Sequence, residues 1–365
     1  MDTITHGLSG ALLGRAMSGR VKNVKPKAFV FVGALASTFP DFDFLFRLIS
    51  EQSYLMNHRG ITHSIFLFPL WAFIISLFSA YIFKNKVLFR QGWVSDNATL
   101  KELKNEFFLL SCISILLHIT LDYITSFGTM LLSPFSDTRF AQGSVFIIDA
   151  WFTGIIILGL LISWKHTTFK PQIAITSFII LFSYVGFTQY IKHDAQNLAL
   201  TKLKTIHSEA DSFKIETFPA AFSPFNWNVV AYDKKTENYY VAYFNLGEVK
   251  SKSINDNMVE ISIVGKTINQ ELWKTIPKWS NNESLSNVAN TAWNDPLFSN
   301  YRWFLQVPAF NSIINNNKKV CIYFKDLRFS SPIRENPFIF GICAPKDGKK
   351  YISRLIEGVD TPIKN

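Results

Sequence analysis

Long apolar stretches fill the first half of this 365-residue chain and constrain its fold more than any other feature. A helix needs roughly 20 apolar residues to cross the hydrocarbon core of a bilayer. Six runs approach that length: 2–19, 28–49, 65–83, 107–123, 145–164 and 172–191. The composition, 48% hydrophobic with 35 Phe residues, is also too apolar for an ordinary soluble domain. We therefore expect a mainly α-helical, polytopic membrane bundle with about six transmembrane helices.

The sequence pattern changes in the second half of the chain. Residues 192–213 are typical of a polar helix that leaves the membrane. Short β-branched or aromatic runs then alternate with segments rich in Asn, Gly, Pro and Asp, at 239–246, 258–264, 319–324 and 338–343. We expect a transmembrane domain over 1–191, a helical linker over 192–213 and a β-rich domain over 214–365. Cys321 and Cys343 could pair, which the sequence leaves open.

Basic residues are distributed unequally among the loops. The loops 20–27, 84–106 and 164–171 together hold 11 Lys and Arg residues, whereas 50–63 and 128–143 hold 2. Short loops rich in Lys and Arg stay in the cytoplasm, so the other loops and the β-rich domain should lie on the extracytoplasmic side of the inner membrane. This topology accounts for the net charge of +10 without nucleic-acid binding, and we expect no nucleic-acid partner.

His118 and Asp122 lie four residues apart in the C-terminal part of the 107–123 run, on one face of the expected helix. Ionisable groups in a membrane segment are costly and usually mark a functional site. Two interpretations remain open from this pair alone. The residues share a metal ion, or they form a hydrogen-bonded pair that only holds two helices together.

More His and Asp residues occur at matching positions in other runs. Asp41 and Asp43 follow a proline that breaks or kinks a helix, and irregular backbone at membrane depth lines a cavity. His58 and His63 precede one run, and His6 lies near the start of another. The predicted topology brings all of them to one depth on the extracytoplasmic side. We therefore predict a shared metal site with ligands drawn from His6, Asp41, Asp43, His58, His63, His118 and Asp122.

The motifs around these residues resemble a known family when they are taken in order. They are Asp2-x-x-Thr5-His6-Gly7, Pro40-Asp41-Phe42-Asp43, His58-Arg59-Gly60-x-Thr62-His63-Ser64, His118-x-x-x-Asp122-x-x-Thr125-Ser126-x-Gly128-Thr129, Pro134-Phe135-Ser136 with Arg139, and Asp149. This set resembles the bacterial membrane-bound metal-dependent hydrolase family of YfhP-, YbcI- and YdjM-like inner-membrane proteins. The weaker segments 223–227 and 326–329 resemble its YfhP-like branch. The resemblance implies a metal-dependent hydrolase and brings no established substrate.

The expected chemistry is metal-assisted hydrolysis of an ester or phosphoester, from a small molecule or a lipid-linked one, among membrane lipids. Histidine with carboxylate suits zinc, with manganese as the alternative, and seven ligands leave one or two ions open. Arg59 and Arg139 are the expected catalytic cations, because guanidinium groups bind phosphoryl and carboxylate groups. Asp149 completes the expected catalytic set as a partner of Arg139 or a supporting group.

Two other function classes remain. A metal or proton transporter needs polar residues along a path to the other side, and the sequence suggests none in the cytoplasmic halves of the expected helices. A non-catalytic membrane sensor or binding protein would keep its activity after loss of the ligand residues.

Overall fold

Two compact units make up the chain in the computed structural model. The described residues are 1–20, 23–85, 92–165, 170–207, 212–247, 261–263, 266–268, 273–331 and 335–363. One unit comprises Met1–Leu45 with Asn57–Thr188, and the other comprises Phe46–Met56 with Gln189–Asn365. Helix α7 (Lys170–Ile206) is continuous and contributes residues to both units, so the expected domain boundary near residue 191 falls inside one helix.

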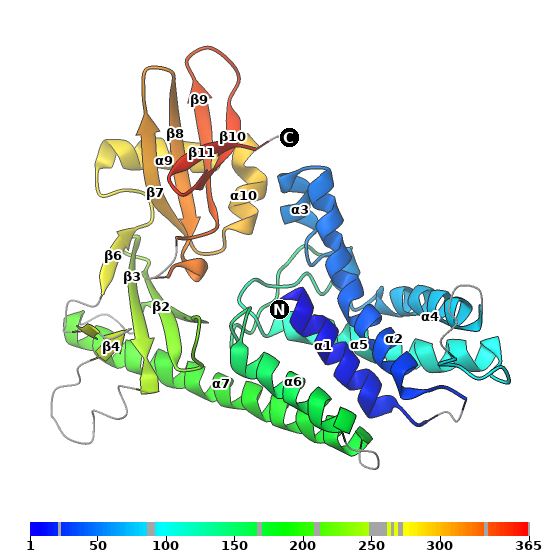
Figure 1. Ribbon diagram of the computed structural model, residues 1–365. Helices are drawn as coiled ribbons and strands as arrows, with labels where there is room; N and C mark the ends of the chain where they lie inside the picture. Colours follow the sequence, from blue (N-terminus) through cyan, green and yellow to red (C-terminus); the bar gives the residue numbers. More distant parts are fainter. Residues whose placement is uncertain are drawn as a thin grey trace, which may run out of the picture. The chain divides into compact units, whose positions relative to one another are not determined.

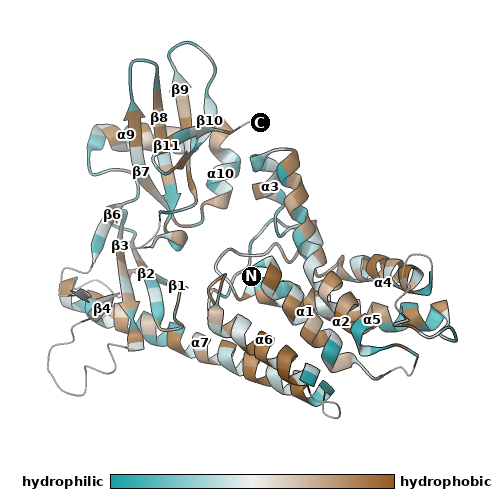
Figure 2. Cartoon of the chain, in the orientation of Figure 1, coloured by the Kyte–Doolittle hydropathy of each residue, from teal (hydrophilic) through white to brown (hydrophobic). Residues whose placement is uncertain are grey.

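The first unit is helical (Figure 1). Its elements are α1 (Thr3–Met17), α2 (Pro26–Thr38), the 3-10 helices η1 (Phe39–Leu48) and η2 (Ile61–His63), α4 (Phe68–Lys84), α5 (Leu100–Tyr123), α6 (Ala150–Lys165) and the first part of α7. Side-chain caps explain where two of these helices begin. Asp2 caps α1 by accepting from the Thr5 amide, and Thr99 and Glu102 form a reciprocal capping box at α5. Hydrophobic residues predominate along α4 and α6 (Figure 2).

The number of membrane spans differs from the expected six. By length and composition, three helices of the described chain can cross a membrane: Pro26–Leu48, Leu100–Tyr123 and Lys170–Ile206. A bent pair, Glu51–His63 with Phe68–Lys84, makes a fourth if it counts as one span. Helices α1 and α6 have 15 and 16 residues. Such helices are only about 24 Å long, shorter than the roughly 30 Å hydrocarbon core. The count of six is therefore not confirmed, although membrane-spanning helices are present.

Helices α1 and α2 meet through glycine. A Cβ atom added to Gly10 would lie 2.2 Å from the Gly33 carbonyl oxygen, and one added to Gly14 would lie 2.2 Å from the Phe29 carbonyl oxygen. Only glycine permits this backbone approach, as in other close pairs of membrane helices. The contact brings the start of α1, which carries His6, close to the end of α2.

The change from α2 to η1 lies beside Pro40. Proline lacks an amide hydrogen and its ring clashes with the preceding helical turn, so α-helical geometry ends at Thr38. The tighter 3-10 helix continues from Phe39, and both Asp41 and Asp43 are buried in it. The expected break at this proline is thus present, and it directs two carboxylates inward.

The second unit contains α3 (Glu51–Asn57), the rest of α7 and antiparallel sheets. One sheet has the order β1-β2-β3-β6, formed by Lys214–Pro219, Asn226–Asp233, Asn238–Asn245 and Lys274–Pro277. The other has the order β11-β10-β9-β8-β7, formed by Val359–Pro362, Tyr351–Ile356, Ile339–Pro345, Lys319–Asp326 and Pro308–Asn315. Helices α9 (Glu283–Asn294) and α10 (Ser299–Phe304) complete the unit.

Each of the four runs expected to form strands contains one in the described chain. Runs 239–246, 319–324 and 338–343 correspond to β3, β8 and β9. Only Ile261–Ile263 of the run 258–264 is described, as strand β4, and its other residues lie outside the described chain. The β-rich character of this half of the chain is therefore confirmed.

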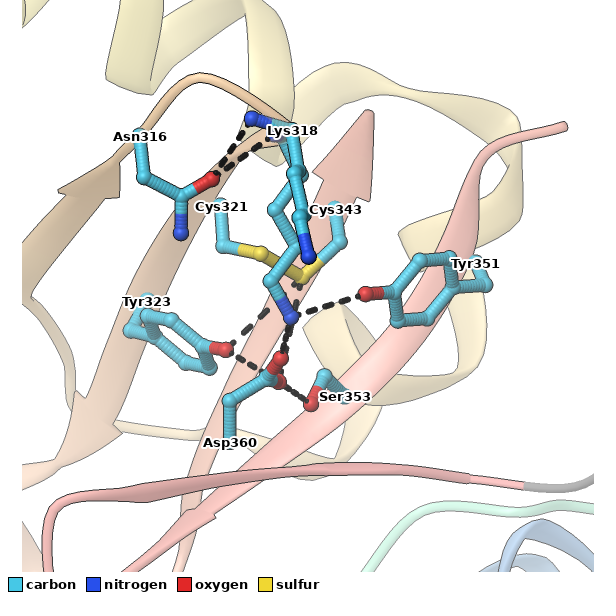
Figure 3. The surroundings of a disulfide bond; sticks show 9 residues. Asn316, Lys318, Cys321, Tyr323, Cys343, Tyr351, Ser353 and Asp360 are labelled. Atoms are coloured by element: carbon cyan, nitrogen blue, oxygen red, sulfur yellow. Dashed lines mark hydrogen bonds and ion pairs between the residues drawn. A yellow bond between two sulfur atoms is a disulfide. The ribbon is translucent and has the colours of Figure 1, made fainter. Parts of the chain in front are cut away.

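Cys321 and Cys343 form a disulfide, which settles the pairing that the sequence left open (Figure 3). They are directly opposite residues of the neighbouring strands β8 and β9. Asp360 of β11 lies beside the bond and accepts hydrogen bonds from Lys319, Tyr323 and Ser353. These contacts tie the edge strand β11 to the middle of the sheet.

Candidate metal centre

Four of the seven predicted ligands converge inside the helical unit. His6 of α1, Asp41 of η1, and His118 and Asp122 of α5 each offer a ligand atom, and these atoms all lie within 4.8 Å of one another. His63 of η2 joins them, because its Nε2 lies 3.0 Å from Asp122 Oδ2 and 2.9 Å from His118 Nε2. We call these five residues the metal cluster. Four separate elements supply it.

The backbone carbonyl of Ser37 decides which ring nitrogen of His118 carries the hydrogen. Its Nδ1 lies 2.6 Å from the Ser37 carbonyl oxygen, which can only accept, so Nδ1 carries the hydrogen. In the tautomer with its hydrogen on Nδ1, the Nε2 atom carries the lone pair and faces the cluster. This is the arrangement of metal-binding histidines, whose second nitrogen donates to a carbonyl or carboxylate.

Thr62 orients the His63 ring in the same way, with Nδ1 facing outward and Nε2 facing the cluster. The Thr62 hydroxyl donates to Asp43 Oδ2 at 3.4 Å and can accept from His63 Nδ1 at 3.0 Å. Asp43 Oδ2 itself lies 3.6 Å from His63 Nδ1. With its hydrogen on Nδ1, His63 also presents the Nε2 lone pair to the cluster. The two nitrogens at 2.9 Å are therefore both acceptors in this state.

Asp43 and His58 form a pair beside the cluster. Asp43 Oδ1 lies 2.8 Å from His58 Nδ1, and Asp43 Oδ2 accepts from the Arg59 amide at 2.7 Å. Of the two carboxylates after the proline, Asp41 therefore faces the metal cluster and Asp43 orients His63 and binds His58. The His58 side chain is 16% exposed, whereas that of Asp43 is fully buried.

Arg59 bridges the cluster and the following loop. Its backbone is left-handed, with φ 59°, which is uncommon for a residue other than glycine. This turn lets the amide reach Asp43 while the guanidinium returns to Asp122, with Nη2 2.8 Å from Oδ1. Nη1 donates to Thr125 Oγ1 at 3.0 Å, and the buried Nε has no hydrogen-bond partner in the described chain.

The structure places the other two expected catalytic residues in supporting positions. Arg139 donates to the carbonyl oxygens of Gly128, at 3.3 Å, and His58, at 3.1 Å, and so links two loops. The Asp149 oxygens accept from the Phe152 amide and the Tyr184 hydroxyl, both at 2.8 Å. Asp149 thus holds the start of α6 against α7, and its catalytic role remains a prediction.

Sequence reasoning missed three groups at the cluster. The Thr3 hydroxyl donates to Asp41 Oδ2 at 2.6 Å, the Met1 amino group contacts Asp122 Oδ1, and the Ser37 carbonyl orients His118. Thr3 carried a weak signal, because it lies one turn before His6 on α1. The other two are main-chain groups, which side-chain patterns do not reveal.

The fold and the cluster together define a helical membrane protein with a buried His/Asp centre that can hold a metal ion. The family model described as YdjM inner membrane protein matches residues 1–195, and the chain belongs to this family. The uncharacterized protein YfhP of Bacillus subtilis (strain 168) is 31% identical over 189 residues. That match covers 50% of this chain and 52% of the relative, so the chain spans about half the length of the curated relative it matches. No solved structure matches the chain.

Proposed function

We propose that this protein is a metal-dependent hydrolase that cleaves an ester or phosphoester on the extracytoplasmic side of the inner membrane. One observation carries the metal: the Nε2 atoms of His63 and His118 and the carboxylate of Asp122 face one another at 2.9 to 3.4 Å, and the outer contacts of both rings favour the tautomer with the hydrogen on Nδ1. Acceptors that face each other repel, and in a buried site they need a cation between them.

The geometry of the cluster fits a transition metal. A tetrahedral zinc ion with bonds of about 2.0–2.1 Å separates its ligand atoms by about 3.4 Å. The neighbouring cluster atoms lie between 2.9 Å (His118 to His63) and 3.7 Å (His118 Nε2 to Asp41 Oδ1). Three imidazoles and two carboxylates suit zinc, and manganese is the alternative because carboxylate also suits it. His6, His63, His118, Asp41 and Asp122 would hold the ion.

The residues around the ion supply the rest of the proposed chemistry. A bound divalent ion supplies Lewis-acid activation of water and of the substrate's carbonyl or phosphoryl oxygen. Arg59 lies against Asp122 and keeps Nε free, so its guanidinium can donate to an anionic group of the substrate. Thr3 holds Asp41, and Thr62 holds His63, which keeps both ligands oriented while substrate enters.

Two observations support the extracytoplasmic placement of the site. The basic loops that the positive-inside rule assigns to the cytoplasm lie at the other ends of the helices that carry the cluster. The disulfide between Cys321 and Cys343 belongs to a chemistry that persists in oxidising compartments and is rare in the cytosol.

The test is metal analysis of the purified full chain, followed by hydrolysis assays with and without the ion. We expect a stoichiometric divalent ion and hydrolysis of model esters or phosphoesters that a chelator abolishes and added metal restores. The control variant is Ser163→Ala, which removes a hydroxyl bonded only to the Leu160 carbonyl of its own helix. A metal-free protein that cleaves none of these esters after metal addition would contradict the proposal.

Transport remains a second candidate because of buried hydroxyls in the other half of the bundle. Ser79 of α4 and Ser111 of α5 are buried, and their hydroxyls lack a hydrogen-bond partner in the described chain. These hydroxyls are polar groups in a region where the sequence suggested no polar path. A metal or proton flux in proteoliposomes that Ser79→Ala/Ser111→Ala abolishes, without loss of bound metal, would favour transport over hydrolysis.

A further inference from the structure

The class of substrate can be inferred from the surroundings of the metal cluster, if the protein is the hydrolase proposed above. We infer that the substrate is a membrane amphiphile, a phosphomonoester with long acyl chains, which reaches the metal cluster from the bilayer. Its chains lie against a group of exposed apolar side chains that we call the apolar collar: Ile4, Phe42, Leu45 and Ile148.

The metal cluster opens to the surface at Asp41. The side chains of His6, His63, His118 and Asp122 are fully buried, whereas that of Asp41 is 12% exposed. A substrate therefore meets Asp41 before it meets the other members of the cluster. The residues around this carboxylate decide which class of molecule can approach.

Apolar side chains surround that opening. Phe42 follows Asp41 directly and is 47% exposed, and Leu45 is 50% exposed. A 3-10 helix has three residues per turn, so Phe42 and Leu45 share one face of η1. That outer face is apolar, and the opposite face carries the buried Asp41 and Asp43.

The neighbouring helix ends extend the apolar collar. Thr3 binds Asp41, and the next residue, Ile4, is 73% exposed. The Asp2 amide donates to the Ile147 carbonyl oxygen, which brings the exposed Ile148 to the same end of the bundle. Three segments that are distant in sequence thus present exposed apolar groups at the end of the bundle where Asp41 reaches the surface.

Part of the apolar collar lies in a helix that can span the membrane, which places these side chains in contact with lipid. Phe42 and Leu45 belong to Pro26–Leu48, a helix long and apolar enough to span a bilayer. Exposed side chains there contact acyl chains. A water-soluble ester would have to cross hydrocarbon to reach Asp41, whereas a lipid already has its chains in that layer and its head group at the interface.

Arg59, beside the metal cluster, favours an anionic head group. Arg59 has a free Nε and lies against Asp122, so an anionic head group can replace part of its contact with the carboxylate. On the other side, the exposed Phe135 packs edge-on against Phe66, with ring centroids 5.2 Å apart. The Ile65 amide donates to the Leu131 carbonyl oxygen, which joins the segments that carry the two rings, and we count this exposed pair as a second lipid-facing edge.

The experiment compares two phosphomonoesters that differ in their acyl chains: dipalmitoyl phosphatidic acid and sn-glycerol 3-phosphate. The full chain is reconstituted in nanodiscs with zinc, and phosphate release is measured. Lipid retention by the metal-free protein in detergent is measured separately by native mass spectrometry. The test variant is Phe42→Ser/Leu45→Ser. The matched control is Leu158→Ser/Ile179→Ser, which changes two equally exposed apolar residues on α6 and α7, away from Asp41.

We expect kcat/KM for phosphatidic acid to exceed that for glycerol 3-phosphate by at least about 100-fold, since each tenfold step needs only a modest gain in binding. In the test variant, kcat/KM for phosphatidic acid should fall by at least about tenfold and the retained lipid should be lost, with unchanged metal content. The control variant should keep its activity and its retained lipid.

Equal cleavage of the two probes, or equal losses in both variants, would overturn the amphiphile inference and leave the hydrolase standing. Absence of any cleavage by zinc-loaded protein would count against the hydrolase. In that case, retention of phosphatidic acid that depends on Phe42 and Leu45 would still support the lipid site, and its absence would overturn it.

Discussion

The Nε2 atoms of His118 and His63 lie 2.9 Å apart, although the two residues are separated by 55 positions in the sequence. The Ser37 carbonyl oxygen accepts a hydrogen bond from Nδ1 of His118, on the side of the ring away from the cluster. The Thr62 hydroxyl occupies the equivalent position at Nδ1 of His63. Asp122 lies against both nitrogens. This arrangement brings three groups that can bind a metal ion to one point, whereas a simple His–Asp pair needs only one acceptor and one donor.

Replacing the helical pair should abolish metal binding. In His118→Leu/Asp122→Leu, three of the five cluster members remain, but both groups contributed by α5 are gone. The wild-type thermal midpoint should fall when chelator is added, because an ion at 1,000 times its Kd stabilises the folded state by about 4 kcal/mol. The variant should insert normally and show no chelator response. A variant that retains stoichiometric metal would show that α5 takes no part in the site.

The two carboxylates of η1 should differ in their effect on metal affinity. Asp41 lies in the cluster, and Asp43 only orients His63 and binds His58. Asp43→Asn should weaken binding by roughly 10- to 100-fold, which is typical for a group that orients a ligand. Asp41→Asn should weaken it further. Competition with a calibrated chelator measures both affinities, and equal losses, or the reverse order, would contradict the assignment.

Loss of Arg59 should destabilise the metal-free protein more than the metal-loaded one. The guanidinium compensates the buried Asp122, and removing one partner of such a pair costs about 3–5 kcal/mol. A bound ion supplies the missing positive charge. Thermal melts of Arg59→Met with and without zinc should therefore show a larger metal-dependent shift than wild type. A smaller shift would mean that the ion and Arg59 do not share Asp122.

Asp149 should matter for stability alone. Its oxygens cap α6 and accept from Tyr184, and no cluster residue depends on these contacts. Asp149→Asn and Tyr184→Phe should each lower the unfolding free energy by roughly 1 kcal/mol, the usual value of a cap or hydrogen bond. Metal content should not change in either variant. Loss of metal in Asp149→Asn would contradict this purely structural role.

The membrane orientation can be tested with fusions. A reporter active only outside the cytoplasm should be active after Asn365 and silent in the 84–106 loop, because 11 of the 13 basic residues in the short loops lie on the opposite side from the cluster. The reverse pattern would move the metal centre to the cytoplasmic face.

Much of the fold was accessible from the sequence. The helical character of the first half and the β-rich second half follow from the length and period of their apolar runs. The span count was less accessible, because apolar composition does not reveal where a helix ends. Helices α1 and α6 are apolar but too short to be assigned as spans by length alone.

At the site, the sequence by itself determined which residue types are available: the face shared by His118 and Asp122, the carboxylates after Pro40, and the histidines before α4. Local spacing suffices for these, because helix geometry and the cost of charge in lipid act on each segment alone. Tertiary structure alone decided that Asp41 enters the cluster and Asp43 supports it, and that Asp149 caps a helix. Those roles depend on distances between segments and on main-chain partners such as the Ser37 carbonyl, which exist only once the helices have packed.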